Sequence, residues 1–105
     1  MEMTFRRALT AKEKDRLILT LTKELILLRT KAEISQEELA KAIGISRQTY
    51  GACERGAKKM SWSTFLSLVL FFDANQKTRR MLRSTGEIYQ EMIWIFNEGI
   101  ARADG

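Results

Sequence analysis

The pattern of apolar and polar positions predicts a helix over residues 10–32. Thr10 and Glu13 have the spacing of a capping box, in which each side chain bonds the backbone N–H of the other residue at a helix start. Apolar residues then recur at helical spacing and form a core-facing stripe of Leu17, Leu21, Leu25, Leu28 and Ala32. Three apolar residues lie outside this stripe and need a second surface, either the C-terminal helix or another subunit: Leu19, Ile26 and Leu27.

Residues 35–56 predict two short helices joined by a tight bend. A second capping box, Ser35 with Glu38, opens the first of them. Gly44 ends it, because glycine enters the left-handed conformation of a helix C-terminus without a steric cost. Ser46 is placed to cap the next helix. So short a bend makes the helices cross steeply, which is the arrangement of a helix-turn-helix.

The same stretch resembles the Cro and phage-repressor class of DNA-binding domains, the XRE family. The resemblance covers roughly residues 17–83. It is carried by Leu28-Arg29, Ser35–Ala40, Gly44-Ile45-Ser46 and Glu54-Arg55-Gly56. It implies an all-α fold, with a five-helix repressor-like helix-turn-helix domain, to which this chain adds a C-terminal helix. We therefore divide the chain into an N-terminal arm (residues 1–9), the helix-turn-helix domain (10–83) and a C-terminal helix (84–105).

The resemblance also indicates which side chains would read DNA bases. The base-reading positions of the family correspond here to Arg47, Gln48, Gly51 and Ala52. Arg47 can donate two hydrogen bonds to guanine O6 and N7, and Gln48 can pair with adenine. Gly51 and Ala52 have almost no reach, so direct readout is expected to be narrow, and DNA shape can carry part of the specificity.

Other side chains of the motif are expected to contact phosphates or to hold the motif together. The predicted phosphate contacts are Gln36, Thr49, Arg55, Lys58 and Lys59. The resemblance further implies a structural ion pair between Arg29 and Glu54, which would tie the first helix to the end of the recognition helix. Such a pair fixes geometry more reliably than it adds stability.

The distribution of charge supports a polyanionic partner. The chain has a net charge of +5, but residues 46–60 and 61–83 each carry +3, whereas residues 84–105 carry −3. One side of the molecule would therefore attract DNA. The cations of the 61–83 segment follow Asn75 on a short predicted helix that is either phosphate-facing or solvated: Lys77, Arg79, Arg80 and Arg83.

Composition gives little support to catalysis. The chain has no histidine, and its one cysteine, Cys53, falls at an inward helix position without a partner base. We therefore expect no enzyme activity, no metal site, no cofactor and no ligand pocket beyond the core. A single cysteine suits a reducing compartment, and no apolar run approaches the roughly 20 residues that span a bilayer. The expected location is the cytoplasm, with no membrane partner.

The C-terminal helix is predicted to open at Ser84, with Glu87 as its capping-box partner. It is apolar on nearly all sides, so both of its faces must be covered. One face can pack on the domain, and the other predicts a dimer interface; a fully packed monomer is the alternative. The predicted interface residues are Tyr89, Ile93, Trp94, Phe96 and Ile100.

Two functions follow from these patterns. The first is a dimeric transcriptional repressor that binds a twofold-symmetric operator, with half-site centres about 34–36 Å apart. The second is an antitoxin-like interaction module whose apolar C-terminal helix binds another protein. A purely structural role for the motif is weakened by the basic cluster beside it.

Overall fold

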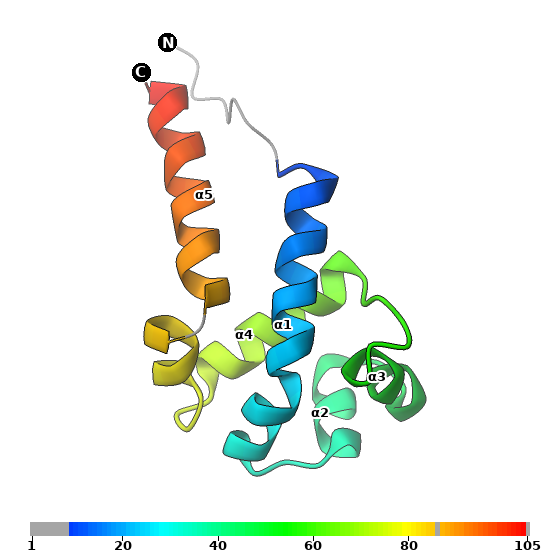
Figure 1. Ribbon diagram of the computed structural model, residues 1–105. Coiled ribbons are helices and arrows are strands. Elements are labelled where there is room, and N and C mark those ends of the chain that lie inside the picture. The colour runs from blue at the N-terminus through cyan, green and yellow to red at the C-terminus, as the bar shows by residue number, and fades with distance from the viewer. Residues whose placement is uncertain (1–8, 86, 105) are drawn as a thin grey trace.

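The structure is a computed structural model that describes residues 9–85 and 87–104. All regular structure in these residues is helical, which confirms the all-α prediction of a helix-turn-helix domain followed by a further helix. The N-terminal arm predicted over residues 1–9 lies outside the described residues except for its last residue. The elements in chain order are α1 (Ala11–Ala32), α2 (Gln36–Ile43), α3 (Arg47–Glu54), α4 (Trp62–Ala74), the π-helical turn η1 (Met81–Thr85) and α5 (Glu87–Asp104) (Figure 1).

The predicted capping residues set where the helices begin. Both capping boxes are formed: the Thr10 hydroxyl accepts from the Glu13 N–H at 3.1 Å, and the Ser35 hydroxyl accepts from the Glu38 N–H at 3.0 Å. At the other end of α2, Gly44 has a φ of 82° and is the left-handed residue that the sequence predicted. These local bonds satisfy backbone groups that have no partner inside a helix.

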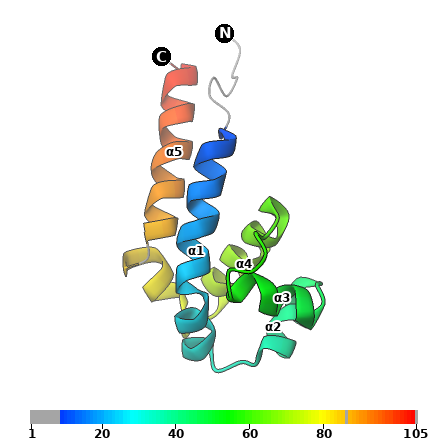
Figure 2. The ribbon, with the colours of Figure 1, turned by 45° about the vertical axis from the view of Figure 1, so that its right-hand side comes forward.

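α1 is the central helix of the fold. It buries the stripe that the sequence predicted, and its leucines pack against large side chains of the other helices, among them Tyr50, Phe65 and Phe72. α5 runs antiparallel to α1 along one side, whereas α2 and α3 lie on the other side and α4 crosses α1 (Figures 1 and 2). Burying a leucine or phenylalanine of this kind contributes about 1.5–3 kcal/mol, so this shared core fixes where α3 stands.

α5 packs on the core but leaves part of α1 uncovered. Its inward side chains are Ile88, which is fully buried, and the half-buried Tyr89 and Met92. The apolar residues left over from the stripe of α1 remain exposed, so the expectation that the C-terminal helix covers them is wrong. The exposed fractions are 55% for Leu19, 58% for Ile26 and 59% for Leu27. Burial of these side chains by another subunit stays a prediction.

The link between α4 and α5 departs from the prediction. α5 begins at Glu87, whereas Ser84 lies inside the π-helical turn, and its hydroxyl donates to the Arg80 carbonyl at 2.5 Å. The Thr78 hydroxyl, which is fully buried, donates to the Phe72 carbonyl at 2.7 Å. This bond, which spans six positions, ties the chain after α4 to the last turn of that helix.

The cations of this link mainly have partners within the chain. Arg79 donates to the carbonyl oxygens of Asp73 and Ala74, which are backbone acceptors at the C-terminus of α4. Arg83 forms a two-pronged ion pair with the Asp73 carboxylate, with N···O distances of 2.6 and 3.0 Å. Lys77 pairs with Glu33, the left-handed residue that ends α1. All four cations of this segment, Arg80 included, are exposed, which agrees with the solvated alternative; a phosphate contact stays a prediction.

Candidate nucleic-acid interface

α2 and α3 form the helix-turn-helix at the end of the domain remote from α5. The bend between them runs through Gly44 and ends at Ser46, whose hydroxyl accepts from the Thr49 N–H at 3.1 Å and so caps α3. Tyr50 and Cys53 face the core from α3 and are buried. α3 lies on the opposite side of α1 from α5 in both views (Figures 1 and 2). Its outer face is therefore turned away from the rest of the chain.

The predicted base-reading residues differ in how exposed they are. Arg47 and Gln48 are exposed at the N-terminal end of α3, and Ala52 is half-buried one turn later. Gly51 is buried, and a Cβ built there would lie 3.6 Å from both Arg55 Nη1 and Gln36 Oε1. These distances are ordinary van der Waals contacts, so an alanine would fit. In this conformation the side chains of Arg55 and Gln36 cover Gly51. The exposed donors of α3 are therefore those of its first turn, Arg47 and Gln48.

Glu54 is the structural centre of the motif. Its carboxylate is 8% exposed and accepts from three helices: from Arg29 of α1 at 2.8 and 3.1 Å, from the Gln36 amide of α2 at 2.9 Å, and from the Tyr50 hydroxyl of α3 at 2.6 Å. Arg29 also donates to the Ile34 carbonyl at 3.2 Å. The arginine–glutamate pair that the family resemblance implied is thus present, and it is part of a larger network.

Charge and burial together set the protonation of this network. Burial raises the pKa of the Glu54 carboxyl, but the hydrogen bonds from Arg29, Tyr50 and Gln36 outweigh it, so the pKa is lowered overall. Burial and the bond to Glu54 raise the pKa of the Tyr50 hydroxyl. The network therefore holds a carboxylate and a neutral phenol near neutral pH.

Sequence reasoning missed two members of this network. It assigned Tyr50 to the core without a polar role, although Tyr50 and Glu54 are four residues apart, the spacing that brings two side chains together on a helix. It assigned Gln36 to a phosphate, whereas its amide donates to Glu54. A link over 18 positions leaves no local pattern in the sequence.

The remaining phosphate candidates surround the recognition helix. Arg55 and Lys58 are exposed, and Thr49 is half-buried at the first turn. Lys59 is exposed too, but its ammonium bonds the Asp15 carboxylate of α1 at 2.6 Å. A phosphate would therefore compete with Asp15 for Lys59.

The predicted interface residues of α5 divide into two groups. Ile93 and Trp94 are 41% and 61% exposed, whereas Tyr89 and Phe96 are half-buried. Ile100 lies in α5, outside the residues whose side chains are described. The exposed pair is separate from the recognition helix, so the surfaces proposed for DNA and for a second subunit do not overlap.

The chemistry of the described residues is that of binding. Burial raises the pKa of the Cys53 thiol, which keeps it protonated. Residues 9–85 and 87–104 contain no cluster of three or more cysteine, aspartate or glutamate side chains arranged to hold a metal ion. None of the helices in the described part of the chain is long and apolar enough to cross a membrane.

Two short helices at a tight bend, with the second held by the Glu54 network and exposing its outer face, define a helix-turn-helix protein. The chain belongs to the helix-turn-helix domain family, whose sequence profile matches residues 21–82. Comparison with curated proteins and with solved structures gave no match. Membership of this family indicates a DNA-binding regulator, which confirms the coarser part of the prediction.

Proposed function

We propose that this protein is a sequence-specific transcriptional regulator of the Cro and phage-repressor (XRE) type, and that α3 enters the major groove of its operator. The observation that supports this most is the exposure of Arg47 and Gln48 on the first turn of α3. That turn is the part of a recognition helix that approaches base edges most closely. The Glu54 network fixes the orientation of α3 from three helices, so these donors are presented on a rigid element.

In this proposal Arg47 reads guanine, Gln48 reads adenine, and Ala52 contacts a thymine methyl group. Gly51 contributes little to the contact, because other side chains cover it. Phosphate contacts come from Thr49, Arg55, Lys58 and Lys59, together with Gln36 at the start of α2. The second N–H of the Gln36 amide is available for this, since one already donates to Glu54.

The regulator acts as a cytoplasmic homodimer that represses a promoter by occupying it. Two α3 helices would enter successive major grooves, with half-site centres about 34–36 Å apart. The dimer forms through α5, which exposes Ile93 and Trp94. The proposed function is binding alone, without catalysis or a cofactor. A histidine-free sequence and a buried, protonated Cys53 support that assignment.

The test is a fluorescence anisotropy titration of a labelled duplex between about 50 and 200 mM salt, the range over which phosphate contacts weaken steeply. We expect binding that falls steeply with salt, and selection from a random duplex pool should then return a twofold-symmetric site. An absence of binding at the lowest salt would overturn the proposal.

The exposed Ile93 and Trp94 also favour one alternative, an antitoxin-like module whose α5 binds another protein. Co-expression with the product of the neighbouring reading frame, followed by gel filtration, distinguishes the two. A stable complex that forms with the wild-type chain and is lost in Trp94→Glu would support the alternative. A homodimer that elutes unchanged beside that product would support the repressor.

A further inference from the structure

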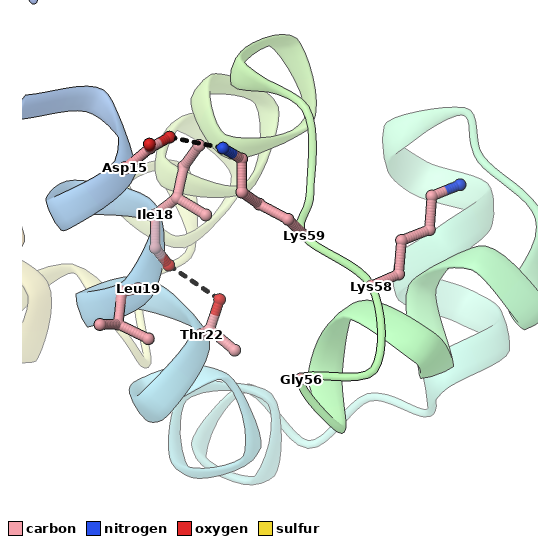
Figure 3. Close-up of a pocket in the computed structure, with 7 residues that line it drawn as sticks. All are labelled: Asp15, Ile18, Leu19, Thr22, Gly56, Lys58 and Lys59. Carbon is pink, nitrogen blue, oxygen red and sulfur yellow. Dashed lines mark hydrogen bonds and ion pairs between the residues drawn. The ribbon is translucent and has the colours of Figure 1, made fainter. Parts of the chain in front are cut away.

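A surface cavity of about 210 Å³ lies between α1 and the loop that follows the recognition helix (Figure 3). The sequence had suggested no pocket outside the core, because its walls come from segments more than 30 positions apart. The lining residues are Asp15, Ile18, Leu19, Thr22, Gly56, Lys58 and Lys59. The cavity therefore joins the central helix to the two lysines that we propose as phosphate contacts.

The walls of this cavity combine apolar and polar groups. Ile18 is buried and Leu19 is 55% exposed, so the α1 side offers an apolar surface with an accessible edge. The Thr22 hydroxyl donates to the Ile18 carbonyl at 2.8 Å, which leaves its oxygen lone pairs free to accept a hydrogen bond. The opposite side is the lysine-bearing loop.

Lys59 already forms an ion pair with a carboxylate at the edge of the cavity. Lys59 Nζ lies 2.6 Å from Asp15 Oδ1, and both side chains are more than half exposed. An exposed pair of this kind is worth little, so a second carboxylate can replace Asp15 at small cost. Lys58 lines the same cavity, and in Figure 3 its ammonium points away from α1, toward α2. A ligand with one negative charge would thus meet the Lys59 ammonium and one displaceable aspartate, with the charge of Lys58 farther off on the same loop.

The volume limits the size of the ligand. A cavity of about 150 Å³ holds benzene, and drug-sized pockets begin at about 300 Å³. A space of 210 Å³ therefore fits a single ring or a short branched chain together with one carboxylate. A larger amphipathic molecule, such as a long-chain fatty acid, would extend from this surface cavity into solvent.

We propose that this cavity is a regulatory site for a small apolar carboxylate of one-ring size. The regulatory part rests on the proposed function, because it assumes that Lys58 and Lys59 contact DNA phosphates. The apolar part of the ligand packs on Ile18 and Leu19, and its carboxylate takes Lys59 from Asp15. Its charge offsets the lysines at the DNA-facing loop, so the loaded protein binds its operator less tightly.

Binding is tested first without DNA, so that its outcome does not depend on the proposed function. Benzoate is the probe, and benzyl alcohol is its neutral counterpart. Titration of the full-length chain, followed by amide NMR shifts, should show saturable millimolar binding of benzoate at residues of α1 and the 56–59 loop. Benzyl alcohol should bind more weakly. Shifts that do not saturate, or equal binding of both compounds, would overturn the carboxylate site.

Two matched variants of α1 localise the binding. Leu19→Glu removes an apolar contact from the cavity and adds a like charge, so benzoate affinity should fall by about tenfold or more. Ile26→Glu makes a similar change at a residue that is 58% exposed on the same helix but does not line the cavity. Its benzoate affinity should equal that of the wild type. Equal losses in the two variants would place the ligand elsewhere.

The regulatory step is tested on the selected operator. Benzoate should raise the Kd for DNA relative to sodium chloride at the same ionic strength, and Leu19→Glu should abolish this response. Saturable benzoate binding that leaves the DNA Kd unchanged would overturn the regulation but not the site. A failure to bind any duplex, with benzoate binding intact, would overturn the proposed function and leave the carboxylate site standing.

Discussion

Glu54 is the residue on which the orientation of the recognition helix depends most. It is a buried carboxylate whose donors come from α1, α2 and α3, so it connects the three helices at one point. A buried ion pair adds little net stability, because its desolvation offsets the attraction between its charges. Its role here is to define one relative position for α2 and α3. Loss of a single partner is nevertheless costly, since it leaves the other charge unpaired.

We therefore expect Glu54→Gln to lower the free energy of unfolding by about 3–5 kcal/mol, the usual result of breaking a buried pair from one side. The Arg29 guanidinium would then lie part-buried without its counter-charge. Urea denaturation followed by circular dichroism measures the change. Glu33→Gln is the matched control, because it removes the exposed ion pair with Lys77, and it should have a much smaller effect. Equal losses in the two variants would show that the Glu54 network has no special role.

The same carboxylate predicts a pH dependence of stability. The pKa of Glu54 is lowered in the folded chain from the ordinary value of 4.5, so the unfolded chain binds more protons just below that pH. The stabilisation that the Glu54 carboxylate contributes is fully present above about pH 4.5, the pKa of the unfolded chain. It is lost as the pH falls through the lower pKa that Glu54 has in the folded chain. Thermal unfolding between pH 6 and about pH 3 should show a steeper acid loss in the wild type than in Glu54→Gln. Parallel profiles would contradict this, since the other carboxylates, Asp73 and Glu38 among them, are common to both proteins.

Substitutions in α3 and in the loop after it should change specificity and affinity separately. Arg47→Ala should cost about 1–3 kcal/mol of binding free energy and relax discrimination at one base position. Lys58→Ala should weaken binding to all duplexes alike and reduce the salt slope by about one unit. Competition with a set of single-base operator variants measures both effects. If Arg47→Ala weakens every duplex equally, Arg47 contacts a phosphate and the assignment of guanine readout fails.

At the scale of elements, one buried hydroxyl contributes to the join between α4 and the π-helical turn, beside the exposed contacts of Arg79 and Arg83. Thr78 donates to the Phe72 carbonyl at 2.7 Å in the last turn of α4, where carbonyls have no partner within the helix. Thr78→Val keeps the shape of the side chain but leaves that carbonyl unsatisfied. We expect a loss of about 1–3 kcal/mol in the free energy of unfolding.

Thr30→Val is the control for this variant, since Thr30 is exposed on α1 and the change is chemically the same. It should leave the urea midpoint almost unchanged. The Thr78 prediction concerns stability alone, because the turn lies away from the recognition helix. Similar midpoints for the two variants would show that water or a neighbouring donor satisfies the Phe72 carbonyl.

The contrast between this turn and α2 shows which elements the sequence could predict. Capping boxes and the glycine at residue 44 act over a few positions, so their patterns were sufficient to place α1, α2 and α3. The start of α5 was misplaced at Ser84: Thr78 and Arg83 bond to residues of α4 six and ten positions earlier, beyond the reach of a capping pattern. The same limit applies to the candidate site. Residue types indicated Arg47 and Gln48, whereas the partners of Gln36 and Lys59 lie on other helices and were not predictable.

At the scale of the molecule, α1 separates the two surfaces to which we assign binding. α3 and the 56–59 loop after it lie on one side of α1, and α5 lies on the other (Figures 1 and 2). The segment with the recognition helix, residues 46–60, carries +3 and the C-terminal segment, residues 84–105, carries −3, while residues 61–83 between them carry a further +3. A second copy that packs on α5 would therefore leave both recognition helices free and keep the acidic segments away from DNA.

This arrangement predicts that dimerisation can be removed without damage to the DNA-binding domain. Trp94 is 61% exposed on α5, so Trp94→Glu should leave the fold intact but place a charge in the subunit interface. Light scattering should give the molar mass of a dimer for the wild type and of a monomer for the variant. Operator affinity should fall, because each monomer then binds one half-site.

Leu70→Glu is the matched control, since Leu70 is 68% exposed on α4, and it should remain a dimer. A wild-type chain that is monomeric at micromolar concentration would end the dimer proposal, and dissociation by both variants would show that the interface is not confined to α5.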